Sequence, residues 1–202
     1  QTRPRRDAPP RPSPYARAPA PSLPNGKKNG PTNAKALKEL YRQYELPPAL
    51  KRQMVDDWEF VTKERRWVTL PRDPCVADLL MAWAQTQRAK KNGARNGPVD
   101  RNAREVAEAL IDYFDAALGT MLLYRSERLQ YNNFMAKRKG KPSKVYGAEH
   151  LCRLFVELPR VMQQARVDEK TVRLLGEKLV DIYKFLEYNG RIAFLVEYQA
   201  AR

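Results

Sequence analysis

Hydrophobic residues recur every three or four positions along most of the chain, a spacing that is typical of amphipathic helices. A helix is predicted from Pro48 to about Arg66, because proline suits the first turn, where its missing N–H would have no partner. One face of this helix carries the apolar residues Leu50, Met54, Val55, Trp58 and Val61. Periodicity alone allows this face either to enter the core or to bind a partner.

The same period predicts helices on both sides of this one. They cover 36–44, the segment after Asp73-Pro74, the segment after Asp100, and residues 128–136, 147–164 and 168–188. Asp73 with Pro74, and also Asp100, are typical of helix starts, and Gly119 interrupts the apolar pattern. Residues 67–71 are expected to be extended, but no long run alternates polar and apolar positions. The sequence therefore predicts an all-α fold with at most one small β-hairpin.

Residues 1–35 differ from everything that follows. They hold nine of the 16 prolines, and eight Lys or Arg against one Asp. A basic, proline-rich stretch with few large apolar residues cannot bury a core. We therefore expect a disordered tail over 1–35 and a helical domain over 36–202. Because Gln1 is an unusual first residue, we also expect this chain to be a piece of a longer protein.

The formal net charge of +15 favours acidic partners. The basic loop over 137–144 suggests that Lys137, Arg138, Lys139 and Lys141 contact nucleic-acid phosphates, through an attraction that is independent of base sequence. A solvated loop explains the same residues, and no aromatic RNA-binding signature is visible. Binding of nucleic acid by the tail and this loop is the alternative function.

The residues give little support for catalysis or for a metal site. His150 is the one histidine, and the two cysteines, Cys75 and Cys152, form no CxxC pair, so zinc has no ligand set. Asp56 and Asp57 are neighbours whose side chains diverge on a helix, which favours ion pairing over acid–base work. No phosphate-binding glycine pattern appears. We expect no enzyme, no cofactor, no metal and two buried, reduced thiols.

Three large aromatic residues lie near helix ends: Trp58, Tyr124 and Tyr146. Such residues usually belong to the core. At the junction of a helix and a loop they can also form the rigid wall of a binding groove, and both interpretations stay open on the residues alone.

Four blocks of the chain resemble the MRG domain family of chromatin-complex subunits. The blocks are LPPALKRQMVDDWEFVTKERRWVTLP (46–71), YFDAALGTMLLYRSER (113–128), VYGAEHLCRLFVELP (145–159) and DEKTVRLLGEKLVDIYKFL (168–186). The resemblance implies an all-α domain of orthogonally packed helices without catalytic activity. It also implies a shallow apolar groove that binds short segments of partner proteins. The family works in nuclear histone acetyltransferase and deacetylase complexes that regulate transcription, so a nuclear location is expected.

Carried over by position, the groove residues are Leu46, Met54, Val55, Trp58, Tyr124, Val156 and Glu157. Leu50 and Val61 are then expected to face the core. Some positions depart from the family's pattern: Ser126 replaces a common aromatic residue, Leu129 and Glu149 replace common prolines, and Glu157 replaces a frequent arginine. Full-length members commonly carry an N-terminal chromo-barrel domain that binds methylated histone tails. We see no such domain in this sequence, so reading of histone marks is not assigned to it.

Overall fold

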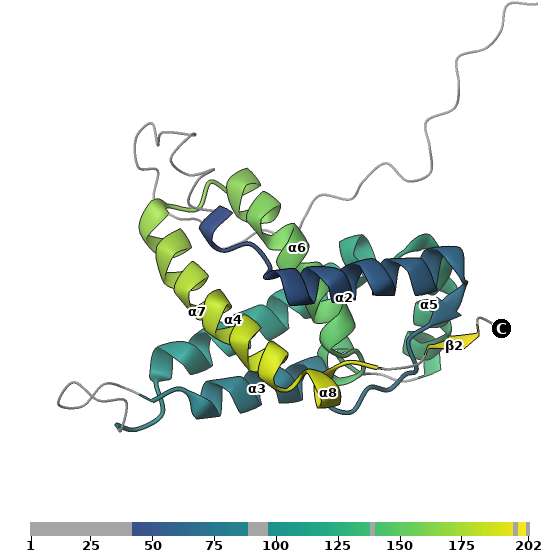
Figure 1. Ribbon diagram of the computed structural model, residues 1–202, viewed down its shortest axis with the longest axis horizontal. Coiled ribbons are helices and arrows are strands. Elements are labelled where there is room, and N and C mark those ends of the chain that lie inside the picture. Colours follow the sequence, from purple (N-terminus) through teal and green to yellow (C-terminus); the bar gives the residue numbers. More distant parts are fainter. Residues whose placement is uncertain (1–41, 89–96, 138–139, 196–197, 201–202) are drawn as a thin grey trace, which may run out of the picture.

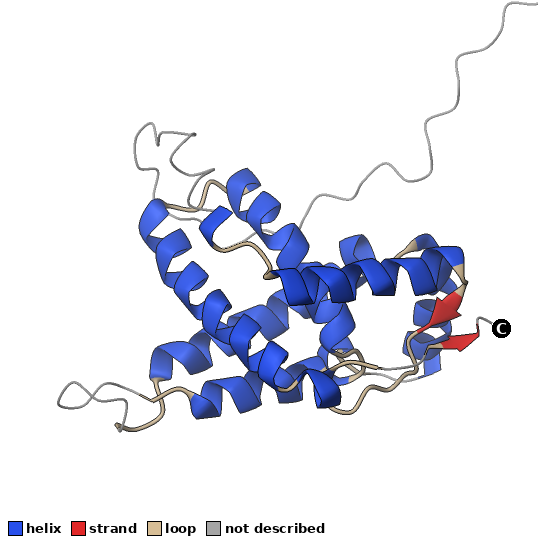
Figure 2. Cartoon of the chain, viewed as in Figure 1, coloured by secondary structure: helices blue, strands red, loops and turns tan. Residues whose placement is uncertain are grey.

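The computed structural model describes residues 42–88, 97–137, 140–195 and 198–200, and these are mostly helical (Figures 1 and 2). The α-helices are α2 (Pro48–Trp58), α3 (Val76–Thr86), α4 (Arg101–Ala117), α5 (Arg128–Lys137), α6 (Ala148–Gln164), α7 (Glu169–Tyr188) and α8 (Gly190–Ala193). Short π-helical turns, η1 (Glu59–Lys63) and η2 (Leu118–Leu122), extend α2 and α4. Two 3-10 turns, η3 (Arg125–Glu127) and η4 (Pro142–Lys144), precede α5 and α6. The predicted all-α class is confirmed.

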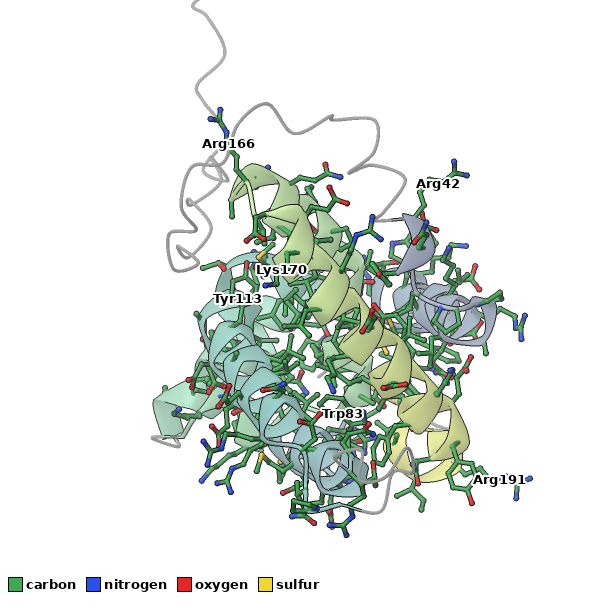
Figure 3. All side chains as sticks on the ribbon, turned by 90° about the vertical axis from the view of Figure 1, so that its left-hand side faces the viewer. Arg42, Trp83, Tyr113, Arg166, Lys170 and Arg191 are labelled. Carbon is green, nitrogen blue, oxygen red and sulfur yellow. The ribbon has the colours of Figure 1, made fainter. Side chains whose placement is uncertain are left out.

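Helix α6 runs through the middle of the fold and packs against α2, α3, α4 and η2 (Figure 1). Contact on several sides explains why most of its residues are buried. Helices α3 and α4 pack along each other, and α7 also contacts α2, α3 and α4. Trp83 of α3 is fully buried and points in among the helices (Figure 3). Most of the core is one continuous cluster, and Val61, Val68 and Tyr198 form a second, smaller one.

Two of the predicted helix starts are confirmed and one is wrong. Asp100 accepts a hydrogen bond from the backbone N–H of Asn102 (3.1 Å), which caps α4, and Asp168 caps α7 in the same way. Helix α3, however, begins at Val76 with Cys75 as its cap, not at Asp73-Pro74. The Asp78 carboxylate reaches back and accepts hydrogen bonds from the backbone N–H and the thiol of Cys75 (3.2 and 2.8 Å). This reciprocal arrangement fixes the start two residues later than the Asp-Pro rule placed it.

Gly119, which interrupts the apolar pattern of the sequence, lies within the π-helical turn that directly follows α4. The chain continues through η2, and Gly119 lies against α5. A Cβ at Gly119 would lie 2.9 Å from the hydroxyl oxygen of Tyr131. The glycine is therefore explained by the close approach of an aromatic side chain.

The small sheet that the sequence allowed is present, but it is not a hairpin. Strand β1 (Arg66–Trp67) pairs antiparallel with β2 (Gln199–Ala200), so that Arg66 lies opposite Ala200. The two strands are far apart in the sequence and pair at one end of the molecule (Figure 2). Local sequence patterns cannot show a pairing over such a separation.

Other expectations have mixed outcomes. Helices α5, α6 and α7 match their predicted ranges closely, whereas the helix that begins at Pro48 passes into η1 and ends at Lys63. Residues 1–35, most of the helix expected over 36–44, and Arg138 and Lys139 lie outside the described residues. Within the described ranges, no helix is both long enough and apolar enough to cross a bilayer.

Candidate functional site

Helix α2 has an apolar side that the fold leaves uncovered. Val55 is 56% exposed and Trp58 is 43% exposed. They are three positions apart and therefore lie on the same side of the helix. Leu50 and, in η1, Val61 are buried, which confirms their predicted core positions. Exposed large apolar side chains that lie together commonly mark a protein interaction site.

Two hollows lie beside this face. The Tyr124 hollow has a volume of about 180 Å³ and is lined by Met54, Met121, Leu122, Leu123, Tyr124, Arg153, Val156 and Glu157. The Leu46 hollow has a volume of about 480 Å³ and is lined by Arg42, Glu45, Leu46, Lys51, Phe155, Val156, Pro159, Arg160 and Gln163. Val156 is 55% exposed and lines both hollows. We call the two hollows, together with Val55 and Trp58, the candidate groove.

The structure brings together most of the residues that the family resemblance selected. Met54, Tyr124, Val156 and Glu157 line the Tyr124 hollow. Leu46 lines the other hollow and is almost fully buried, so it forms floor more than wall. Val55 and Trp58 line neither hollow but project from the same helix as Met54. Val156 lines both hollows and so lies between them.

Sequence reasoning missed the contribution of η2 and most of the Leu46 hollow. Met121, Leu122 and Leu123 line the Tyr124 hollow from η2, a segment that was interpreted as a broken pattern. Arg153 had a visible signal, because it stands inside an otherwise apolar run, and a buried arginine needs partners. Pro159 had one as well, because it lies inside the predicted helix, and the structure places it at the Leu46 hollow.

Beneath the Tyr124 hollow lies a buried ionic cluster centred on Arg153. The guanidinium donates to both carboxylate oxygens of Asp57 (2.8 and 3.0 Å) and to both of Glu127 (2.5 and 3.0 Å). It also donates to the backbone oxygen of Leu122 (3.1 Å). Burial acts to lower the pKa of Arg153, but the two carboxylates outweigh it and raise that pKa. The cluster thereby joins α2, η3 and α6 through one cation.

Further groups complete the cluster. The Tyr198 hydroxyl donates to Asp57 (2.9 Å), and Nε2 of His150 lies 3.1 Å from Glu127. The guanidinium carbon of Arg153 lies 4.1 Å from the centre of the Tyr124 ring, a cation–π contact that holds this ring at the groove. Burial raises the pKa of Tyr124 to about 12, so its hydroxyl stays neutral at physiological pH.

The acidic pair, the histidine and the cysteine that the sequence offered for catalysis or metal binding are explained by ion pairing, hydrogen bonding and burial. Asp56 is exposed and Asp57 is buried, so the two carboxylates diverge, and the ion pair of Asp57 is with the distant Arg153. His150 is buried in the core and hydrogen bonds to Glu127. Cys152 is a buried free thiol, and burial raises its pKa well above its usual value. Among the described residues, no three His, Cys, Asp or Glu side chains are grouped so that they could hold a metal ion.

The structure also places one aromatic and two acidic residues that the sequence singled out. Tyr146 is 1% exposed and belongs to the core, so of its two interpretations the structure favours the ordinary one. Glu149 is fully buried and forms an ion pair with Arg72 (3.0 Å), while its Oε1 accepts from the backbone N–H of Leu195 (2.9 Å). Glu157 is half-buried and forms an ion pair with Arg160. The departure at Glu149 thus affects the core, whereas the departure at Glu157 lies at the groove.

Only some of the residues predicted to contact nucleic-acid phosphates lie among the described residues. The Lys137 side chain, Arg138 and Lys139 lie outside the described residues, and Lys141 donates a hydrogen bond to Asp112 of α4 (3.2 Å). The described residues carry 23 Lys or Arg and 20 Asp or Glu, so most of the net charge of +15 belongs to the remaining segments. Nucleic-acid binding stays a prediction.

Acidification is expected to destabilise the fold as the pH falls from about 4.5 toward 2. Burial acts to raise the pKa of Glu127, but the charges and hydrogen bonds of Arg153 and His150 outweigh it and lower that pKa from 4.5 to about 2. A carboxyl group with a depressed pKa stabilises the folded state above its unfolded pKa, and protonation removes that contribution. The full loss amounts to roughly 3 kcal/mol. About 2 kcal/mol of it should already be lost at pH 3, measurable as the free energy of unfolding in urea at pH 6, 4 and 3.

The variant Glu127→Gln should have a flatter pH dependence over this range. The matched variant Glu108→Gln, which changes an exposed carboxylate, should keep the wild-type slope. Identical slopes for wild type and Glu127→Gln would show that Glu127 does not carry this dependence.

Comparison with known proteins gives one consistent family. The family model described as MRG matches residues 25–200. The chain is 42% identical over 156 residues to the chromatin modification-related protein EAF3 of Yarrowia lipolytica, covering 75% of this chain and 40% of that protein. It is 34% identical over 209 residues to the protein of the same name from Mycosarcoma maydis (89% and 62%). It is 36% identical over 158 residues to the NuA4 complex subunit EAF3 homolog of Dictyostelium discoideum (78% and 39%). The chain therefore spans between 39% and 62% of the length of these relatives.

Proposed function

The chain belongs to the MRG family, and from this premise we propose that it is a non-catalytic, chromatin-associated adaptor whose candidate groove binds short apolar segments of partner proteins. The relatives are named as chromatin modification-related proteins and as a homolog of a NuA4 complex subunit. We extend this association to the present chain. The partners would be subunits of histone acetyltransferase or deacetylase complexes, and the protein would act in the nucleus to regulate transcription.

The observation that carries the proposal is the uncovered apolar surface of the candidate groove. Val55, Trp58 and Val156 are each about half exposed, although together they could have been buried against one another or under a loop. Exposed apolar area is unfavourable in water, and burying it on a partner recovers roughly 25 cal/mol per Å². The two adjoining hollows can receive partner side chains, which a flat patch cannot do.

The buried cluster supports a binding role, because it holds the groove in a fixed shape. Arg153 links Asp57 of α2 to Glu127 of η3 and also packs on the Tyr124 ring. The elements around the Tyr124 hollow are therefore joined before any partner arrives. A preformed site loses less conformational entropy on binding than one that must be ordered first.

The proposal is tested by replacing Val156 with aspartate and comparing the captured proteins. The intact chain, immobilised and incubated with nuclear extract, is expected to retain subunits of histone-modifying complexes, which mass spectrometry identifies. Val156→Asp places a charge between the two hollows and should reduce their recovery at least tenfold, because the partner would have to bury an unpaired carboxylate.

The matched control is Leu174→Asp on α7, where the side chain is 50% exposed and lines neither hollow. It should capture the same proteins as wild type, and both variants should keep the wild-type circular dichroism spectrum. Equal recovery by Val156→Asp and wild type would rule out the candidate groove as the binding site.

A further inference from the structure

The charge that a ligand can reach in the Tyr124 hollow is negative. Two charged side chains line this hollow, Arg153 and Glu157. Arg153 is only 6% exposed, and Asp57 and Glu127 already occupy its N–H groups. The Glu157 side chain is 34% exposed, so among the described lining residues its carboxylate is the accessible charge.

The Leu46 hollow has the opposite sign. Three cations, Arg42, Lys51 and Arg160, and one anion, Glu45, line it. Lys51 lies 2.8 Å from Glu45, and about half of each side chain is exposed. The lining of this hollow therefore has an excess of positive charge.

The ion pairs around the two hollows can be exchanged for pairs with a ligand. Lys51 with Glu45, and Arg160 with Glu157, are partly exposed pairs of neighbouring or nearby residues. Such pairs typically contribute about 1 kcal/mol or less. A ligand that supplies an acid to Lys51 and Arg160, and a base to Glu157, can replace these contacts at little cost.

Val156 lies between the negative charge of the Tyr124 hollow and the positive charge of the Leu46 hollow, because its side chain lines both hollows. We infer that the groove takes a partner segment with two apolar anchors and a definite charge polarity. A basic residue would accompany the anchor in the Tyr124 hollow, and an acidic residue would accompany the anchor in the Leu46 hollow. This inference rests on the proposed function and adds to it the chemistry and the orientation of the partner.

The polarity selects one direction of binding. A segment placed in reverse would bring its base to Arg42, Lys51 and Arg160 and its acid to Glu157, where like charges repel. Each exposed charge pair changes affinity by about 1.4- to 5-fold. For the two ends together, a segment with its charges exchanged should bind about 2- to 30-fold more weakly.

The test uses random peptides of about 16 residues, displayed on phage and selected on the intact chain. Peptides that also bind Val156→Asp are removed, so that the remaining ones depend on the groove. Each selected peptide is then synthesised with its sequence unchanged and with its acidic and basic residues exchanged. The two forms have the same composition and the same apolar residues. Dissociation constants are measured for both by fluorescence anisotropy.

Four charge variants locate the effect. Glu157→Lys and Lys51→Glu should each reduce the preference for the original peptide over its exchanged form, and the double variant should reverse it. Glu177→Lys and Lys184→Glu make the same changes of charge at exposed positions of α7 that line neither hollow, and should leave the preference unchanged.

Each outcome decides something. If selected peptides depend on Val156 but bind equally well with their charges exchanged, or if the double variant does not alter the preference, the charge polarity is refuted and the proposed function stands. If no peptide distinguishes the intact chain from Val156→Asp, the groove does not bind peptides, and the proposed function fails together with this inference.

Discussion

Replacing Arg153 with methionine is expected to lower the free energy of unfolding by about 3–5 kcal/mol. The substitution removes the cation but leaves the carboxylates of Asp57 and Glu127, which are 0% and 1% exposed, without their charge partner. A buried charge without a partner costs more than the lost attraction, because the group cannot regain its hydration. Since domains of this size are stable by only about 5–15 kcal/mol, the loss should be readily visible in urea or thermal unfolding followed by circular dichroism.

Arg173→Met is the matched control. Arg173 pairs with Glu169 on the surface of α7 at 2.7 Å, with both side chains about half exposed. Its removal should cost less than about 1 kcal/mol. If Arg153→Met cost no more than Arg173→Met, the cluster would not hold α2, η3 and α6 together.

A second substitution separates the charge from the packing. In Arg153→Met combined with Glu127→Gln, one of the two stranded carboxylates becomes neutral. The double variant should therefore be more stable than the sum of the single losses predicts, because the two residues are coupled. Additive losses would indicate that shape, and not charge, dominates at this position.

The local elements could be predicted from the sequence to the extent that nearby residues determine them. Helix α7 has its cap at Asp168 and a regular apolar face, and both are visible in a single stretch of chain. The start of α3 was misplaced, because the side chain of Asp78 reaches back to Cys75 and competes with the Asp73-Pro74 signal.

The candidate groove was only partly predictable. The resemblance to a family supplied Met54, Trp58, Tyr124 and Val156, which are far apart in sequence, whereas periodicity alone did not distinguish a groove from core. Most of the Leu46 hollow was missed, because it depends on how α2 and α6 pack together. The spacing of apolar residues along one helix does not show how that helix crosses another.

The ionic cluster shows the same limit. Asp57 and Arg153 are separated by 96 residues, and Tyr198 reaches Asp57 from 141 residues away. From the sequence, Asp57 was grouped with its neighbour Asp56, since adjacency was all that could be seen. The signal that Arg153 needed a buried anion was present in its apolar surroundings, but the identity of that anion was not.

Replacing Trp58 with alanine is expected to abolish most partner binding while the fold survives. The residue is 43% exposed, and the exposed side chain of Lys63 makes a cation contact with its ring, 4.9 Å from the ring centre. Because almost half of this residue is exposed, its truncation should cost the free protein less than the loss of a fully buried aromatic side chain. In a complex, an aromatic side chain of this kind is a typical binding hot spot, and truncating it costs about 2–4 kcal/mol, or about 30- to 1000-fold in Kd. The measurement is the Kd of the subunit most enriched by the intact chain, together with the circular dichroism spectrum and the melting temperature of the variant.

Tyr188→Ala provides the control for loss of an exposed aromatic side chain. Tyr188 is 91% exposed at the end of α7 and lines neither hollow, so its removal should change neither Kd nor stability.

Tyr124→Ala is a less discriminating variant, because the Tyr124 ring also packs on Arg153, so its loss should weaken the fold as well as the groove. Loss of the helical spectrum in Trp58→Ala would make Trp58 a core residue, and an unchanged Kd would place the partner elsewhere. The decisive result is weaker binding by Trp58→Ala together with wild-type binding by Tyr188→Ala, with both variants folded. It would assign the uncovered face of α2 to partner binding, because neither unfolding nor the mere loss of an exposed aromatic side chain could then explain the weaker binding.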